Sequence, residues 1–205
     1  MHPHFQVLAG GSHSLLYTLS LHSGPVTSLA CLLLAPSSLT LATTSTDSTV
    51  ATTTISTQQE NVEVKEAGHS LALQGGLAIC LHLVLLPGQE EPLLVVARED
   101  CRLHLMQGGL KVGVLEGHED WVTCLASKVE EGQMVLASGG QDSLVRLWRV
   151  NRWGDSLLLE AGELSVREEE LVLGRGEQWR VRADSVLAGH EGRPYSVEWG
   201  PGGGF

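Results

Sequence analysis

Lysine and arginine are absent from the first 64 residues of this 205-residue sequence, and Lys65 is the first basic residue. This absence argues against an N-terminal basic arm, and the formal net charge of −11 argues against nucleic-acid binding through counterion release. Long apolar runs are missing too, since the longest, 26–35 and 77–86, are about half the length of a membrane helix. The N-terminus also lacks the charged region and apolar core of a secretory signal. We therefore expect a soluble intracellular chain without membrane contact.

Cysteine pairs and catalytic motifs are also missing. The four cysteines form no C-x-x-C pair, which makes buried free thiols in a reducing compartment a better expectation than a zinc site or disulfides; they are Cys31, Cys80, Cys101 and Cys124. The sequence has no G-x-S-x-G nucleophile elbow, no phosphate-binding loop and no paired catalytic carboxylates. We expect no enzymatic activity, no cofactor, no metal and no small-molecule substrate.

Short apolar runs that alternate with turn residues are present instead, together with abundant Gly, Ser and Thr, and this pattern is typical of β structure. One segment, 115–150, opens with Gly117-His118 and ends its last apolar run at Trp148. A unit of about 40–45 residues with a Gly-His start and a Trp end is the signature of a WD40 repeat. The sequence therefore predicts an all-β chain of WD40 repeats.

Four residues of this repeat predict a hydrogen-bond network. His118, Ser138, Asp142 and Trp148 occupy the positions where WD repeats link the loop His to a strand Ser, a turn Asp and an indole N–H. Each buried polar group finds a partner in such a chain, which pins the loop to the blade. A hydrolase triad of His118, Asp142 and Ser138 is the competing interpretation, but it leaves Trp148 unexplained.

Weaker copies of the repeat flank this one. In the first copy, His22 opens the repeat, Asp47 is the turn Asp and Thr43 takes the Ser position, whereas Thr53 stands where Trp is expected. That network should lack its indole, and the packing of the blade should suffer.

The middle copy has Asp100 in the turn and Met106 at the Trp position, and it lacks a His at the expected start near 75–76. The last copy opens at Gly189-His190 and predicts a strand over 195–199.

The copies predict about three blades and two partial ones, too few to close a ring, so we expect an incomplete WD40 β-propeller. An insertion within the third blade is either a solvated surface loop or a partner-binding element. Within 1–205 the expected boundaries are a partial blade at 1–21, a blade at 22–69, a degenerate blade at 70–113, a blade with a charged insertion (151–182) at 114–188, and the start of the next blade at 189–205.

The motifs resemble those of a more specific family, the WD-repeat proteins that serve as the second subunit of the Elongator complex. The resemblance covers roughly residues 15–199 and includes both the degenerate repeat and the long insertion. The segments that carry it are GHEDWV at 117–122, QDSLVRLW at 141–148, SVLAGHE at 185–191, AICL at 78–81 and DCRLH at 100–104.

This resemblance implies part of the first of two seven-bladed propellers in a non-catalytic scaffold. Its partners would be the largest Elongator subunit and the catalytic radical-SAM and acetyltransferase subunit. That complex starts the 5-methoxycarbonylmethyl-type modification of the tRNA wobble uridine (U34), in the cytoplasm and nucleus. The iron–sulfur and acetyl-CoA chemistry would belong to another chain, and the acidic charge argues against direct tRNA contact.

The loop after His118 is the expected partner contact, because WD propellers present this loop on the face used for partners. It carries Glu119, Asp120 and Trp121. Trp121 is either a partly exposed anchor for a partner or an aromatic cap on the core. An unrelated WD40 adaptor, such as a substrate receptor of a ubiquitin ligase, remains the alternative function.

Overall fold

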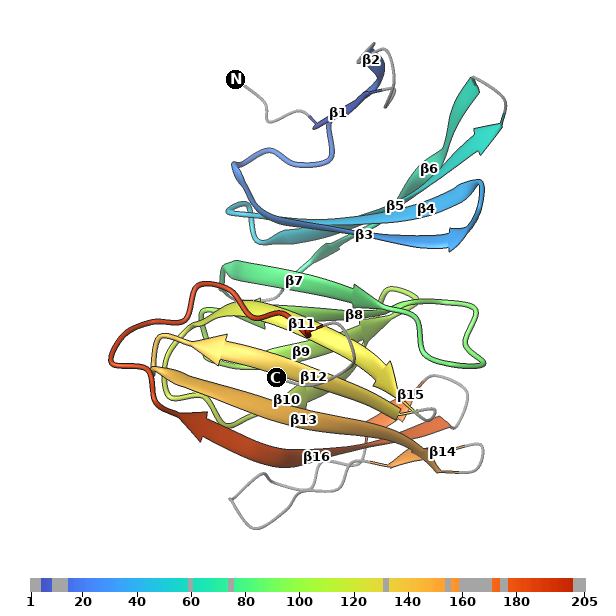
Figure 1. Ribbon diagram of the computed structural model, residues 1–205. Coiled ribbons are helices and arrows are strands. Elements are labelled where there is room, and N and C mark those ends of the chain that lie inside the picture. Colours follow the sequence, from blue (N-terminus) through green and yellow to red (C-terminus); the bar gives the residue numbers. More distant parts are fainter. Residues whose placement is uncertain are drawn as a thin grey trace. The chain divides into compact units, whose positions relative to one another are not determined.

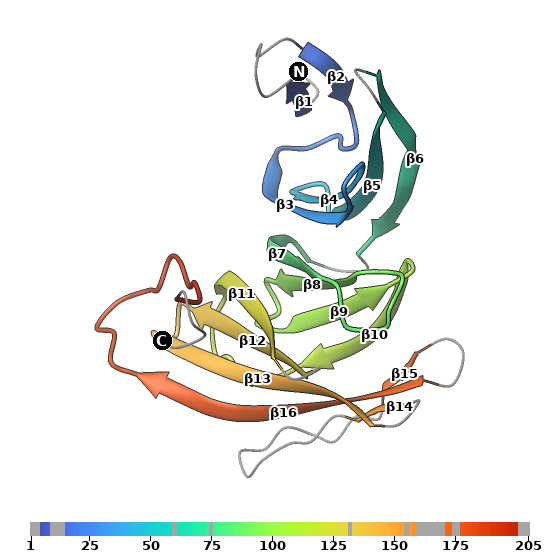
Figure 2. The ribbon, with the colours of Figure 1, turned by 45° about the vertical axis from the view of Figure 1, so that its right-hand side comes forward.

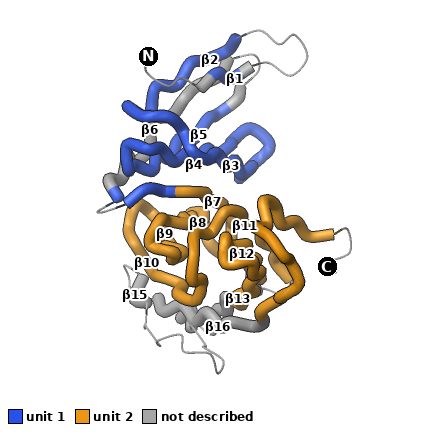
Figure 3. Tube along the Cα trace, turned by 90° about the vertical axis from the view of Figure 1, so that its left-hand side faces the viewer, with its two compact units in different colours: residues 1–78 blue, residues 79–205 orange. Residues whose placement is uncertain are grey.

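The computed structural model describes residues 5–8, 15–58, 61–73, 76–130, 133–153, 156–158, 171–173 and 177–200. Every regular element within these ranges is a β-strand. Accordingly, this part of the chain contains no helix of the length and apolar character that crossing a bilayer requires. The chain divides into two compact units, residues 1–78 and residues 79–205 (Figure 3).

The first unit holds a hairpin and one four-stranded antiparallel sheet (Figure 1). The hairpin pairs β1 (Phe5–Leu8) with β2 (Leu15–Leu19). The sheet has the order β3-β4-β5-β6, and its strands are Val26–Ala35, Ser38–Ser45, Thr49–Gln58 and Asn61–Ala72. Since each strand pairs with its neighbour in sequence, the sheet is a meander, the arrangement of a propeller blade.

Two sheets make up the second unit, with β7 starting at the boundary between the units (Figure 2). One has the order β7-β8-β9-β10, with strands Ala78–Val84, Leu93–Arg98, Leu103–Gln107 and Leu110–Leu115. The other has the order β11-β12-β13-β16-β15, with β14 paired to β13. Its strands are Val122–Glu130, Gln133–Gly140, Leu144–Trp153, Ser156–Leu158 (β14), Leu171–Leu173 (β15) and Glu177–Ala188 (β16).

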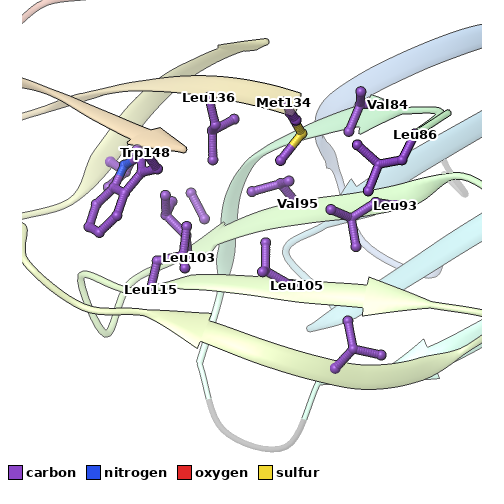
Figure 4. Close-up of a cluster of buried hydrophobic side chains, with 13 residues drawn as sticks. Val84, Leu86, Leu93, Val95, Leu103, Leu105, Leu115, Met134, Leu136 and Trp148 are labelled. Atoms are coloured by element: carbon purple, nitrogen blue, oxygen red, sulfur yellow. The ribbon is translucent and has the colours of Figure 1, made fainter. Parts of the chain in front are cut away.

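The main core lies between these two sheets of the second unit (Figure 4). The β7–β10 sheet contributes mostly Leu and Val, and the other sheet contributes Val122, Met134, Leu136 and Trp148. Strand β8 is buried at every position, which explains why its sequence is a continuous apolar run rather than an alternating one. The packing of blade against blade therefore depends on large side chains from both sheets.

One turn conformation recurs in the two four-stranded sheets and in the six-stranded one, between the second and third strands of each repeat. The residue after the turn Asp has a left-handed backbone in each case, with φ of 63° at Ser48, 65° at Cys101 and 64° at Ser143. A backbone hydrogen bond closes each turn, with N···O distances of 3.2, 3.1 and 3.1 Å in the same order. Left-handed φ is uncommon outside glycine, so its recurrence marks the three sheets as copies of one unit.

The junctions between the sheets fall slightly later than the expected boundaries at 69/70 and 113/114. Strand β6 stays paired with β5 up to the pair Thr49–Ala72, and β10 stays paired with β9 up to Leu115–Leu103. The fourth strand of each sheet, β6 or β10, thus ends opposite the first residue of the third strand, β5 or β9.

The insertion at 151–182 was expected to be either a surface loop or a partner-binding element, and its described residues form strands rather than a loop. Strand β13 runs on to Trp153, β14 and β15 lie within the insertion, and β16 starts at Glu177 and pairs with β13 from Asn151–Arg180 to Leu144–Ala188. Apolar and charged residues alternate over 179–182, which is a strand pattern that the abundance of charge obscured. The rest of the insertion lies outside the described residues.

The strand expected at 195–199 is not formed, and this prediction is wrong. After β16 the chain runs back beside β11 without regular structure (Figures 1 and 2). Its contacts there are the Pro194 carbonyl, which accepts from Thr123 Oγ1 at 2.6 Å, and the Trp199 ring, whose centroid lies 4.2 Å from Lys128 Nζ. Proline has no N–H for a strand ladder, and this segment has no paired strand among the described residues.

All four cysteines are free, and Cys124 is buried as expected. Cys31 is exposed, which corrects the expectation of buried thiols. It lies on β3, where exposure alternates along the strand, and its side chain falls on the more exposed face.

Candidate functional site

The third repeat brings His118, Ser138, Asp142 and Trp148 together through three hydrogen bonds. His118 Nδ1 lies 2.8 Å from Asp142 Oδ2, and His118 Nε2 lies 2.8 Å from Ser138 Oγ. The indole Nε1–H of Trp148 donates to Ser138 Oγ at 2.9 Å. The loop between β10 and β11 supplies His118, and β12, the following turn and β13 supply the other three side chains.

Donor and acceptor chemistry determines which nitrogen of His118 carries hydrogen. A carboxylate can only accept, so Nδ1–H donates to Asp142. Nε2 then accepts from the Ser138 hydroxyl, which itself accepts from Trp148. The neutral imidazole satisfies every member of the chain, which a protonated ring would not do without turning the Ser138 hydroxyl.

The pKa directions agree with this assignment. Burial lowers the pKa of His118, and the hydrogen bond with Asp142 opposes this only in part. Burial opposes ionisation of Asp142, but hydrogen bonds from His118 and the backbone N–H groups of Glu119 and Leu144 outweigh it and lower the pKa. The folded state therefore favours a neutral His118 beside an ionised Asp142.

A glycine beside the network keeps space for it. A Cβ on Gly140 would lie 2.5 Å from both His118 Nδ1 and Asp142 Oδ1. Any larger residue at this position would push the two side chains apart, so the local sequence is fitted to the hydrogen bond.

The first repeat builds the same network with a threonine inserted. His22 Nδ1–H donates to Thr49 Oγ1 at 2.7 Å, and the Thr49 hydroxyl donates to Asp47 Oδ1 at 2.6 Å. His22 Nε2 lies 2.7 Å from Thr43 Oγ1, and Thr43 occupies the position that Ser138 has in the third repeat. Burial opposes ionisation of Asp47, but hydrogen bonds from the Thr49 side chain and from backbone N–H groups outweigh it. The pKa of Asp47 is therefore lowered, and the carboxylate stays ionised.

Thr53 occupies the Trp position of this repeat, as the sequence indicates. It pairs with Leu41 across the sheet, as Trp148 pairs with Leu136. Its side chain is 1% exposed, and its hydroxyl has no hydrogen-bond partner among the described residues. The first repeat therefore keeps the His–Asp half of the network but loses the indole half.

The middle repeat replaces the missing loop His with His104, which sequence reasoning missed. His104 lies on β9, four residues after Asp100, and its Nε2–H donates to Asp100 Oδ2 at 2.9 Å. Burial lowers the pKa of His104, and Asp100 opposes that shift. The spacing of four residues between the turn Asp and this His was the available signal, and it brings the two side chains within 2.9 Å.

The expected partner residues lie on what we call the Gly-His loop, residues 116–121. Glu119 and Asp120 are exposed, and Trp121 is 41% exposed, whereas Trp148 is 1% exposed. The Trp121 N–H donates to Asp120 Oδ1 at 2.7 Å, and its carbonyl accepts from the Gln141 N–H at 2.8 Å. The backbone of Trp121 is thus held while part of its ring faces solvent.

The hydrolase alternative fails on access. Ser138 is fully buried and its hydroxyl already serves His118 and Trp148, so it cannot reach a substrate. Within the part of the chain that the structure describes, no group of three or more His, Cys, Asp or Glu side chains could hold a metal ion. The arrangement is suited to holding a loop in place.

The family described as "WD domain, G-beta repeat" matches residues 13–51 and 109–149. These two matches contain the first and third networks and omit the middle repeat, whose His comes from a strand. In its fold, the chain is similar to one in a solved structure of a humanized mutant of the Chaetomium thermophilum Polycomb Repressive Complex 2 bound to the inhibitor GSK126. The TM-score is 0.52 at 16% identity, covering 72% of this chain and 31% of that one. The chain is therefore an all-β, incomplete WD40 propeller.

More specific relatives carry the name Elongator complex protein 2. The Danio rerio protein is 34% identical over 185 residues, covering 88% of this chain and 22% of the relative. The Drosophila melanogaster protein is 30% identical over 208 residues, covering 89% and 26%. The resemblance to this Elongator subunit is thus confirmed, and the chain spans about a quarter of the length of these relatives.

The network predicts unequal effects of two aspartate substitutions. Asp142→Ala should destabilise the full-length protein by about 1–3 kcal/mol, because it leaves His118 and two backbone N–H groups without their acceptor. Asp100→Ala should cost less, because the Asp100 side chain is 32% exposed against 6% for Asp142 and water can replace it. Urea denaturation measures both, and equal losses would contradict the assignment.

The unpartnered hydroxyl of Thr53 predicts a stabilising substitution. Thr53→Val removes a buried polar group of similar size and should raise the free energy of unfolding by about 1 kcal/mol. Thr43→Val is the matched control, because the Thr43 hydroxyl bonds His22 and its loss should destabilise the protein. A Thr53→Val variant less stable than the parent would show that the hydroxyl has a partner.

Two buried histidines, His104 and His118, and the half-buried His82 predict a loss of stability in mild acid. Burial lowers the pKa of His82, His104 and His118 below the ordinary value of 6.5. The unfolded chain then binds more protons than the folded one, so stability is full above pH 6.5 and declines as the pH falls below it. Each group contributes up to about 1.4 kcal/mol per pH unit. Denaturation midpoints from pH 7.5 to 5 should show this decline, and a smaller one in His118→Asn; a rise on acidification would contradict it.

Proposed function

We propose that this chain is part of a non-catalytic scaffold subunit of the Elongator complex and acts through protein–protein contacts. The observation that carries the proposal is the match to Elongator complex protein 2 of several species over most of the chain. The geometry supports it, because the buried His, Ser and Asp side chains are used to hold a loop and not to reach a substrate.

In this role the chain would support modification of the tRNA wobble uridine without touching the reacting atoms. Its partners would be the largest Elongator subunit and the catalytic radical-SAM and acetyltransferase subunit, and its location would be the cytoplasm and nucleus. The net charge of −11 favours protein contacts over direct contact with tRNA.

The Gly-His loop is the proposed contact, with Trp121 as the anchor. The exposure of its ring favours an anchor over a core cap, since tryptophan is enriched among residues that dominate binding energy. Hydrogen bonds of Glu119 and Trp121 to the turn, and of Trp121 to Asp120, anchor the backbone of the loop.

Trp121→Ala in the full-length protein should reduce co-purification of the other Elongator subunits by at least about fivefold, the range of a binding hot spot. The thermal midpoint should stay near that of the parent. Trp148→Ala is the contrasting control, because its ring lies in the core and its loss should cost about 3–5 kcal/mol. Normal recovery of Elongator subunits by an unstable Trp121→Ala protein would overturn the anchor role, and recovery of ubiquitin-ligase subunits by the parent would overturn the Elongator role.

A further inference from the structure

The Gly-His loop has a second property beyond its exposed ring, which is the sign of its charge. Residues 112–127 contain no Lys or Arg, whereas the loop contains Glu116, Glu119 and Asp120. The neighbouring turn adds Glu99 and Asp100, both exposed. Trp121 is therefore an exposed ring next to the exposed carboxylates of Glu119 and Asp120.

Two basic side chains lie at the loop: Arg146, whose Nη1 would be 3.4 Å from a Cβ on Gly117, and Arg102, which is engaged in an ion pair. Arg102 Nε donates to Glu116 Oε1 at 2.9 Å, across the gap between the turn and the loop. Burial and then the carboxylates of Asp120, Asp100 and Asp142 raise the pKa of the Cys101 thiol, so the fields of the three carboxylates overlap at this point. Glu119 and Asp120 take part in none of the ion pairs among the described residues.

The loop is also fixed in position before a partner arrives. Glu116 is held by Arg102, the Glu119 N–H donates to Asp142 Oδ2 at 3.1 Å, and Gln141 N–H holds the Trp121 carbonyl. A surface that is already ordered binds without a large loss of conformational entropy. An exposed ring that stays in one place among carboxylates is an electrostatic match for a cation.

We infer that the Gly-His loop docks a Lys- or Arg-rich segment of a partner protein, with a basic side chain over the Trp121 ring and others beside Glu119 and Asp120. This inference rests on the proposed scaffold function, and it specifies the chemistry of the partner at the same loop. Both the ring face and the carboxylates attract a cation, so the two contacts act on the same segment.

The test uses the purified full-length protein and a fluorescein-labelled decapeptide of alternating Arg and Gly, followed by fluorescence anisotropy. Two variants remove one contact each: Trp121→Leu removes the ring face, and Glu119→Gln with Asp120→Asn removes two charges. Asparagine at 120 can still accept from the Trp121 N–H, and Glu119 enters the network only through its backbone, so the loop stays intact. Each variant should weaken binding by about three- to tenfold, and the charge variant should also reduce the salt dependence.

The matched control removes the same charge elsewhere. Glu90 and Glu91 are exposed on the β7–β8 connection, at the end of the sheet opposite the Asp100 turn, so Glu90→Gln with Glu91→Gln should leave binding unchanged. Equal binding by the parent and the charge variant, or equal weakening by the control, would overturn the inference. If the peptide fails to bind while Elongator subunits still co-purify, the basic partner is wrong and the scaffold function stands.

Discussion

The hydrogen bond between a neutral histidine and the turn aspartate is the interaction on which the rest of this structure depends. In the third repeat it joins the Gly-His loop to the turn between β12 and β13. The two bonded residues, His118 and Asp142, are 24 positions apart in sequence. One ring nitrogen of the histidine donates to the aspartate, and the other accepts from the serine hydroxyl. The serine oxygen in turn accepts from the indole N–H of Trp148. The indole carries the chain of hydrogen bonds into the apolar core, so the position of a surface loop is coupled to the packing between blades.

The three repeats show how far this arrangement can vary while the turn stays the same. Each repeat keeps the turn aspartate and a left-handed residue after it, but the histidine reaches the aspartate directly, through Thr49, or from strand β9 as His104. In each repeat the turn carboxylate accepts from backbone N–H groups, and a side-chain donor completes its hydrogen bonding. The tryptophan is less constrained, because Thr53 and Met106 take its place while the turn keeps the same left-handed residue.

Much of this could be predicted from the sequence, because the residue types of the third repeat and their spacing repeat a known pattern. The loss of the indole at Thr53 and the all-β fold follow from the same pattern. His104 could not be placed in this way, because its contact depends on which strand position faces the turn, and the pattern specifies only the loop histidine. The strands within 151–182 were missed because strands that contain many charged residues resemble a solvated loop in composition. The strand at 195–199 was predicted from repeat spacing, but a strand also needs a paired neighbour, which spacing does not provide.

The protonation state of the His118 ring tests this account most directly. Long-range proton–nitrogen correlation spectra of the full-length protein, with His118→Asn as the assignment control, report which ring nitrogen carries hydrogen. The account predicts a neutral ring at pH 7 with hydrogen on Nδ1, bonded to Asp142, and a bare Nε2 that accepts from Ser138. Hydrogen on Nε2 alone, or a fully protonated ring at that pH, would contradict the network as the constraint that fixes the loop.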